Sequence, residues 1–432
     1  MMTGLPRSSG DGLPATGGSL SRHVQVACTR RSTAGVSGIK MTTAPHASIN
    51  LGNGVVIGHP VFLAPMAGVS DAVFRQLCRE AGAGYATTEF SRDEALLRGI
   101  QAQVDLIDLS LDARPAGVQI FGSDPDTMRR AAAFVMSHAA PDVLDINMGC
   151  PAPKVTAGQG GSSLLRDPDR AIAIVRGIAE EIAPTPTTVK IRVGWDDAHK
   201  QSGVAVSLAK RLVDTGARMI TVHGRTRQQR YEGLACWDTI AAVAAAVSVP
   251  VIGNGDIQTP ADVMHRLRTS GVSGVAIGRA ARGRPWIFGQ IAAAMAGQPV
   301  PPDPDTASRI ALGLDHISRQ IAYEAACVAR DPSHARRAEA TIHGLASGRA
   351  LGHLLPHVMW YVWGTPGANE ARRALSRARS AEELHDVLAD FGARPDAYRH
   401  REEDRALATV RPSGSDAVQD NAGQRETTPA GH

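Results

Sequence analysis

The stretch "VPVIGNGDIQTPADVMHRLRTSGVSGVAIGRA", residues 249–280, contains two short apolar runs separated by a polar segment. The apolar runs 249–255 and 274–278 each end in a glycine-containing turn, and a helix is expected over 260–269. Strand, loop, helix and strand in this order form a βαβ unit, whose two strands lie parallel in one sheet. The stretch therefore predicts an α/β fold.

The same unit recurs towards the N-terminus. Six further strands are predicted at 61–65, 84–89, 116–122, 143–147, 188–193 and 219–224, and helices at 71–81, 125–139, 168–182, 204–215 and 237–247. Eight strands alternating with helices predict a (β/α)8 TIM barrel. The alternative is a doubly wound open sheet, which is expected to carry a Gly-x-Gly-x-x-Gly fingerprint after its first strand. The stretch "APMAGVSD" (64–71) lacks that fingerprint.

The composition divides the chain into four parts. Residues 1–48 are rich in Gly, Ser and Thr and are expected to form a disordered N-terminal extension. The barrel is expected over 49–300. The proline-rich "PVPPDPD" (299–305) is typical of a linker and precedes helical patterns, so a small all-α domain is predicted over 301–395. A disordered tail is expected over 396–432.

Charge and cysteine content exclude several classes of protein. No run of eighteen apolar residues occurs, so no membrane partner is predicted. The five cysteines are scattered without a Cys-x-x-Cys pair, which argues against a zinc site or a disulfide framework and for a reducing cytoplasm. The net charge of +4 comes from residues 1–40, so any nucleic-acid surface must be local. No protein partner is predicted.

Polar residues stand where the predicted strands end, and in TIM barrels the chemistry takes place at the C-terminal ends of the strands. Any one of these residues could be an ordinary loop residue, but eight such ends together predict a pocket. The residues are Pro65, Met66 and Ala67; Glu89; Gln119; Asn147 and Cys150; Lys190 and Arg192; His223 and Arg225; Asn254, Gly255 and Asp256; and Gly278 and Arg279.

The last two strand ends, "GNGD" and "IGRAARGRP", are glycine-containing turns of the kind that binds phosphate in this fold. Lys190 could stabilise negative charge on a reduced flavin ring, and Gln119 could both donate to and accept from its pyrimidine edge. Met66 offers a soft contact for a flat ring. These features suggest FMN, although a phosphorylated sugar or metabolite would use the same loops.

The chain resembles the tRNA-dihydrouridine synthases, and it is most like the bacterial B-type branch with the motif NMGCPxxKV. The matching stretches are "APMAGVSDAVFR", "VQIFGSDP", "DINMGCPAPKV", "VKIRVGW", "HGRTRQQRYEG", "PVIGNGDI" and "GRAARGRPWIF". The resemblance implies an FMN-binding barrel followed by a helical tRNA-binding domain. It also implies reduction of the uridine C5=C6 bond in tRNA, with NADPH or NADH as the hydride donor.

The resemblance also implies roles for single residues. Cys150 is implied to be the catalytic acid. Asn147, Lys154, Arg192 and Arg225 are implied to line the uridine pocket or to meet RNA, and no metal site is implied. Flavin contacts are implied for Pro65, Met66, Ala67, Gln119, Lys190, His223, Asn254, Gly255, Asp256, Gly278 and Arg279.

The chemistry of Cys150 agrees with that role. A thiol with an ordinary pKa near 8.5 is mostly protonated at neutral pH and can donate a proton to carbon. Lys154 could lower that pKa. The alternative is that Cys150 is a packing residue in a tight turn.

Two other functions are weighed against the tRNA reductase. One is an FMN barrel acting on a free small molecule, similar to dihydroorotate dehydrogenase. The other is a non-catalytic RNA-binding protein. The helical extension and the loop arginines argue against the first, and the presence of Cys150, Lys190 and His223 argues against the second.

The C-terminal region departs from the family pattern. In "LLPHVMWYVWGTPGA" (354–368), Leu355 and Pro356 stand where the family usually carries a basic pair before a histidine. His357, Trp360 and Tyr361 remain. Pro356 is expected to break or kink a helix.

Overall fold

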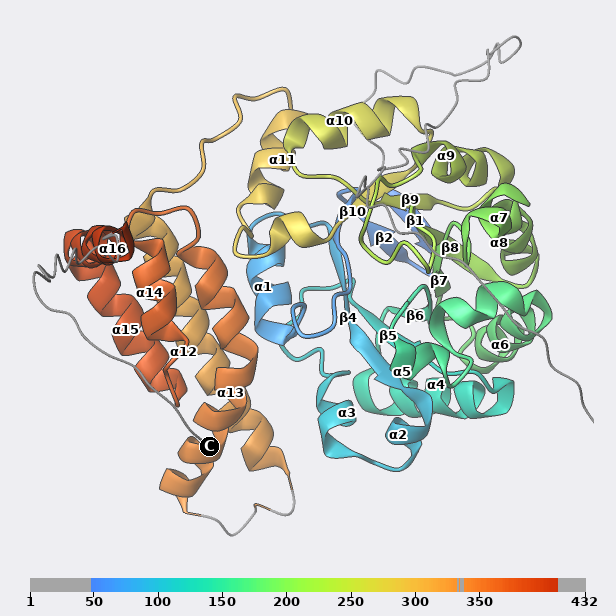
Figure 1. Ribbon diagram of the computed structural model, residues 1–432. Coiled ribbons are helices and arrows are strands. Elements are labelled where there is room, and N and C mark those ends of the chain that lie inside the picture. Colours follow the sequence, from blue (N-terminus) through green and yellow to red (C-terminus); the bar gives the residue numbers. More distant parts are fainter. Residues whose placement is uncertain (1–47, 332–333, 335–337, 411–432) are drawn as a thin grey trace, which may run out of the picture. The chain divides into compact units, whose positions relative to one another are not determined.

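The computed structural model describes residues 48–331, 334 and 338–410. Its centre is a closed barrel of eight parallel strands, hydrogen-bonded in the order β10-β3-β4-β5-β6-β7-β8-β9 (Figure 1). The predicted TIM barrel and its eight strands are confirmed. The strands are β3 (Val61–Leu63), β4 (Tyr85–Arg92), β5 (Gly117–Phe121), β6 (Val143–Met148), β7 (Thr187–Arg192), β8 (Ala217–His223), β9 (Val251–Asn254) and β10 (Gly274–Ile277).

Helices surround the strands (Figure 1), and a single apolar core fills the layer between them. The larger helices are α1 (Ala72–Glu80), α4 (Pro125–Ala139), α6 (Pro168–Glu181), α8 (Val204–Asp214), α9 (Trp237–Ala246), α10 (Pro260–Thr269) and α11 (Ile287–Met295). Shorter elements are α2 (Asp93–Leu97), α3 (Gln101–Asp105), α5 (Pro153–Thr156), α7 (Asp197–Gln201), and the 3-10 helices η1 (Gly161–Arg166) and η2 (Arg279–Ala281).

Side-chain caps explain why several of these helices begin where the strand-end loops finish. Asp71, Asp124, Asp167 and Thr259 each accept a hydrogen bond from a backbone N–H in the first turn of α1, α4, α6 and α10. Such caps satisfy donors that have no partner within the helix. The last three of these helices also begin with proline, whose fixed φ suits the first helical position.

A two-stranded antiparallel hairpin, β1 (Ile49–Gly52) and β2 (Val55–Ile57), precedes the barrel and was not predicted. Its turn places Gly52, Asn53 and Gly54 at positive φ, which glycine and asparagine tolerate. Buried side chains of the hairpin form a separate apolar cluster with residues of the barrel, from Tyr85 and Val143 at strand starts to Ala64 and Ala276, which also line the cavity described below. The hairpin therefore adds a second core, inside the barrel and beneath the cavity.

The C-terminal region is helical, as predicted. Its helices are α12 (Thr306–Arg330), α13 (Glu339–Tyr361), α14 (Ala368–Leu375), α15 (Ala381–Ala393) and α16 (Pro395–Val410). Buried residues of these helices, among them Leu354, Val358, Leu384 and Leu388, form an apolar core of their own.

Two expectations for this region, a tail that begins at residue 396 and a helix break at Pro356, are wrong. Residues 396–410 belong to helix α16 and not to a tail, because Tyr398 is buried against Phe391, with ring centroids 5.2 Å apart. Helix α13 continues through Pro356, because buried neighbours such as Leu354 and Val358 hold both sides of it in the core. The expected disorder of residues 1–47 and 411–432 lies outside the described residues.

None of the helices in the described part of the chain is long and apolar enough to cross a membrane.

Candidate active site

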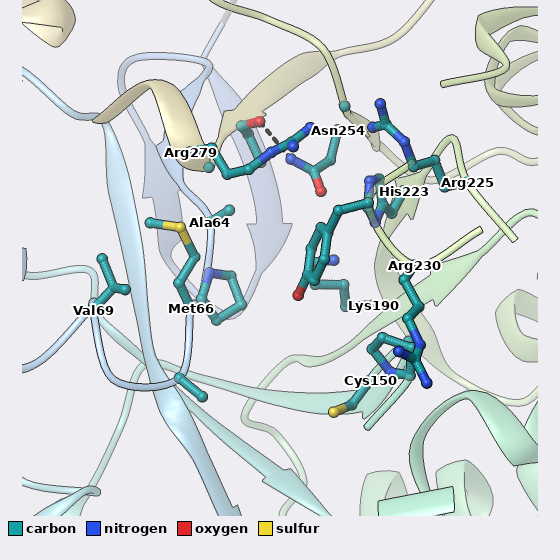
Figure 2. Close-up of a pocket in the computed structure, with 18 of the residues that line it drawn as sticks. Ala64, Met66, Val69, Cys150, Lys190, His223, Arg225, Arg230, Asn254 and Arg279 are labelled. Atoms are coloured by element: carbon teal, nitrogen blue, oxygen red, sulfur yellow. Dashed lines mark hydrogen bonds between the residues drawn. The ribbon is translucent and has the colours of Figure 1, made fainter. Parts of the chain in front are cut away.

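A cavity of about 810 Å³ opens where the barrel strands end, and its volume falls in the range of small-molecule and cofactor sites. Figure 2 shows Met66 and Val69 on one side of it and Cys150, Lys190 and His223 on the other. All but three of the site residues expected from the sequence line this cavity, and the three exceptions are Glu89, Gln119 and Lys154. Those that line it are Pro65, Met66, Ala67, Asn147, Cys150, Lys190, Arg192, His223, Arg225, Asn254, Gly255, Asp256, Gly278 and Arg279.

Cys150 lies in a tight turn that the protein fixes from both sides. The side-chain oxygen of Asn147 accepts hydrogen bonds from the N–H groups of Gly149 and Cys150, at 3.1 and 2.9 Å. The Cys150 carbonyl accepts from the N–H and hydroxyl of Ser162, at 3.1 and 2.9 Å. Gly161 permits this approach, because a Cβ on it would lie 2.9 Å from that carbonyl oxygen. The thiol is therefore presented to the cavity by a rigid turn.

Burial raises the pKa of the Cys150 thiol, and a backbone hydrogen bond with Ala152 and the charges of Arg192 and Lys190 only partly oppose that effect. The thiol is therefore protonated at neutral pH, and the site holds a neutral acid. A nucleophilic thiolate would require the opposite shift.

Lys190 and His223 face the cavity without a hydrogen-bond partner among the described residues. Burial, followed by the charge of Arg192, lowers the pKa of Lys190 to about 8. Burial and the charges of Lys190 and Arg192 hold the pKa of His223 well below its usual value, so the imidazole is neutral. A ligand with an electron-rich acceptor edge would supply the partner that the Lys190 ammonium lacks.

The structure does not bring Gln119 into the cavity. Its amide nitrogen donates to Asp145 Oδ2 at 2.6 Å, and its amide oxygen accepts from Asn147 Nδ2 at 2.8 Å. Thr188 donates to the other oxygen of Asp145 at 2.5 Å. In this structure Gln119 and Asp145 form a buried layer that orients Asn147, and through it the Cys150 turn.

Arg192 and Arg225 line the cavity, but their guanidinium groups are directed at the protein. Arg192 donates to the carbonyls of Gly149, Thr226 and Arg230 at 2.7, 2.7 and 2.9 Å. Arg225 pairs with Asp256 at 2.6 Å and also donates to the backbone of Glu232 and Gly233. Arg192, at the end of β7, therefore holds the loop that follows β8 against the barrel, and Arg225, within that loop, joins it to the loop after β9.

Two more expected residues lie outside the cavity: Lys154 is exposed on the short helix α5, and the carboxylate of Glu89 binds the backbone of Gly68 and Val69. Conversely, the cavity wall contains residues that strand-end reasoning did not select, among them Val69, Tyr231 and Arg282. The exposed ring of Tyr231 lies near the guanidinium groups of Arg192 and Arg279, with centroid distances of 5.8 and 5.7 Å. Tyr231 lies inside the stretch "HGRTRQQRYEG". The sequence therefore showed the motif, but it did not show that the Tyr231 ring lies in the cavity wall.

The loops after β9 and β10 supply the features of an anion site. Gly255 and Asp256 adopt left-handed φ values of +129° and +51°, which turn the loop sharply after β9. Arg279, Arg282 and Arg284 line the same end of the cavity. Arg225 pairs with the carboxylate of Asp256, and the guanidinium of Arg279 lies 3.4 Å from the same carboxylate. These two positive charges reduce the repulsion between Asp256 and an anion bound in the cavity.

The family model described as "Dihydrouridine synthase (Dus)" matches residues 62–394 of this chain. A relative from Xanthomonas campestris pv. campestris, tRNA-dihydrouridine synthase B, is 36% identical over 335 residues, which cover 78% of this chain and 93% of the relative. A probable tRNA-dihydrouridine synthase from Mycobacterium tuberculosis is 34% identical to this chain, and the aligned residues cover 78% of this chain and 82% of the relative.

The chain belongs to the dihydrouridine synthase family. The matched segment of this dihydrouridine synthase begins in β3 and reaches the end of α15. It therefore includes both the barrel that carries Cys150 and most of the C-terminal helices. The relatives named as B-type agree with the bacterial branch that the NMGCPxxKV motif indicated.

Proposed function

We propose that this dihydrouridine synthase reduces the C5=C6 bond of uridine in tRNA, with FMN in the cavity and NADPH or NADH as the source of hydride. One observation carries the proposal. A protonated thiol, Cys150, is fixed at one wall of a cavity that also presents a half-buried ammonium, that of Lys190, without a hydrogen-bond partner among the described residues. Reduction of an activated C=C bond needs both an acid and a site that tolerates an electron-rich ring.

The cavity residues fit FMN. Lys190 would face the pyrimidine edge of the ring, where negative charge gathers on reduction. His223 is uncharged, so Lys190 would supply the positive charge at that edge. Met66 and Ala67 would contact the ring, while Gly278 and Arg279 would receive the phosphate. Reduced FMN bound here would supply hydride to C6 of the uracil.

Cys150 completes the reduction by donating its proton to C5. Addition of hydride at C6 and of a proton at C5 gives 5,6-dihydrouridine, and the resulting thiolate regains its proton from solvent. The raised pKa of Cys150 keeps it in the donating form before the reaction. The hydrogen bonds from Gly149 and Cys150 to Asn147 keep the thiol in one position, so the acid does not need to be ordered during the reaction.

The target base must leave the RNA stack to reach this cavity, at a cost of a few kcal/mol. Two arginine–aromatic pairs, one at the cavity wall and one in the C-terminal region, would provide contacts for the surrounding RNA. Arg282, in the cavity wall, lies over the Trp360 ring at 5.4 Å. In the C-terminal helices, Arg372 lies over the exposed ring of Trp363 at 4.7 Å. We propose that these pairs take over RNA contacts that the family's basic pair would make at Leu355 and Pro356.

The test uses the purified full chain with tRNA from a strain that lacks this gene. The expected result is a yellow protein with a flavin absorption band, which oxidises NADPH or NADH and introduces dihydrouridine at positions that are unmodified in that strain. A protein without bound flavin, or one that reduces free pyrimidines but leaves tRNA unchanged, would overturn the proposal.

A further inference from the structure

The loop of residues 66–71, which follows β3, forms the cavity wall opposite Cys150 (Figure 2). Glu89 holds this loop from the barrel side. One carboxylate oxygen accepts from the Gly68 N–H at 2.8 Å and the other from the Val69 N–H at 3.2 Å. Arg75 adds a hydrogen bond to the Ser70 carbonyl at 3.0 Å.

A further contact to this loop comes from far along the chain. His357, on α13, is fully buried, and its Nε2 donates to the Val69 carbonyl at 3.1 Å. The same nitrogen lies 3.5 Å from Oδ2 of Asp71, the residue that ends the loop and caps α1. Val69 is thus bound through its N–H by Glu89 and through its carbonyl by His357.

The surroundings of His357 restrain its ring. The Phe74 ring lies 4.5 Å away and the His316 ring 4.7 Å away, measured between ring centroids. His316 is itself fixed by a hydrogen bond between its Nδ1 and the Tyr361 hydroxyl, at 3.0 Å. The imidazole of His357 therefore has little freedom to turn away from Val69.

We propose that His357 is a positioning residue for the flavin site. Through its hydrogen bond to the Val69 carbonyl, it sets the conformation of the 66–71 loop, so that the packing of the C-terminal helices on the barrel shapes the cavity wall. The inference builds on the proposal that the cavity binds FMN. A purely structural residue would contribute to stability alone, whereas a positioning residue also alters ligand binding at a wall that it does not itself line.

The same residues raise the question of a metal ion. Asp71, His316 and His357 could each offer one ligand atom, and these atoms lie within 4.8 Å of one another. However, Nε2 of His357, which faces Asp71, donates to the Val69 carbonyl and so carries a proton. Metal ligation requires a deprotonated ring nitrogen. We therefore interpret the cluster as a hydrogen-bonded contact between helix and loop.

The test compares three variants of the full chain. His357→Phe keeps a ring but removes the donor, His357→Gln keeps a donor, and His353→Phe changes a more exposed histidine on the same helix. Affinity for FMN is measured by flavin fluorescence during reconstitution of the apoprotein. Exchange of the Gly68 and Val69 amide hydrogens is measured in the apoprotein by mass spectrometry.

We expect His357→Phe to weaken FMN binding about three- to tenfold, the loss of one ordinary hydrogen bond. Exchange at Gly68 and Val69 should become faster. His357→Gln should recover most of the affinity, and His353→Phe should match the wild type.

A folded His357→Phe protein with unchanged exchange in the 66–71 loop would overturn the inference. So would stoichiometric zinc in the wild type that is lost in His357→Gln. If the wild type binds no FMN, the proposed function fails, but the exchange measurement still decides whether His357 orders the loop.

Discussion

At the residue scale, the thiol of Cys150 determines whether this cavity can protonate carbon. Cys150→Ala should lower dihydrouridine formation by about 10²- to 10⁴-fold, the usual contribution of a general acid. Binding of FMN and oxidation of NADPH should persist, because no flavin contact is removed. Cys236→Ala is the matched control, since Cys236 is half-buried and absent from the cavity wall. Full activity of Cys150→Ala would remove the thiol from the mechanism.

The protonation state of Cys150 predicts the pH dependence of the chemical step. The thiol must be protonated to act, and burial raises its pKa. In pre-reduced enzyme the negative charge of the ring would keep Lys190 protonated, so the rate of uridine reduction should stay level through pH 8 and fall only above the pKa of the thiol. Single-turnover measurements between pH 6.5 and 10 check this expectation. A decline that begins below pH 7.5 would contradict a protonated thiol.

Lys190 links the protonation of the cavity wall to the stability of the apoprotein. Its pKa in the folded protein, about 8, lies below the ordinary lysine value of 10.5. Between these values the unfolded chain binds more protons, so this residue makes the free energy of unfolding of the apoprotein rise with pH. The rise should be on the order of 1–3 kcal/mol, and Lys190→Met should abolish it while weakening FMN binding. Denaturant unfolding of both apoproteins at pH 7.5 and 9.5 provides the comparison. Equal pH slopes would contradict the assignment.

Strand ends could be predicted from the sequence because a change from apolar to polar residues marks where a strand leaves the core. The direction in which a side chain points at that end could not be predicted. Gln119 is bound by Asp145 and Asn147 of the neighbouring strand β6, and Arg192 by carbonyls of the loop after β8. These partners lie 26 to 38 residues away in sequence, so no local pattern displays them.

At the element scale, the loop after β8 depends on Arg192, which reaches it from the end of β7. Arg192→Lys keeps the charge but cannot form three separate hydrogen bonds in the geometry of a guanidinium. We expect a loss of about 1–3 kcal/mol in the free energy of unfolding and faster amide exchange over residues 224–235. Arg211→Lys serves as the control, because its pair with Asp169 is exposed and should be worth less than about 1 kcal/mol. Equal losses in the two variants would contradict this role.

Some elements escaped prediction for identifiable reasons. The hairpin β1–β2 has strands of only four and three residues, too short for an alternating pattern to stand out. Pro356 lacks the backbone N–H of a regular helical position, but buried Leu354 and Val358 on either side of it hold helix α13 in the core. In both cases tertiary packing outweighs a local signal.

At the scale of the whole molecule, ion pairs join the C-terminal helices to the barrel. Arg330 pairs with Asp108 at 2.7 Å, Arg349 with Asp105 at 2.5 Å and Arg319 with Glu80 at 2.8 Å. The sequence predicted that barrel and helices are present but not this contact, because its partners are more than 200 residues apart. The buried cluster around His357 lies in the same contact, which connects RNA-binding helices to the flavin cavity in the proposed function.

The arginine–tryptophan pairs of the C-terminal helices should decide tRNA affinity. Trp363 is 62% exposed and Arg372 lies over its ring, an arrangement that can stack a base and contact a phosphate. Trp363→Ala should weaken tRNA binding by about 1–3 kcal/mol. Arg372→Ala should also weaken it and reduce the slope of log affinity against log salt by about one counterion. Filter binding at several salt concentrations measures both effects, with Arg211→Ala, a surface residue of the barrel helix α8, as the control. Unchanged tRNA affinity in both variants would contradict a role for this pair in replacing the basic pair that Leu355 and Pro356 lack. The replacement contact would then be expected at Arg282 in the cavity wall, whose guanidinium lies over the Trp360 ring.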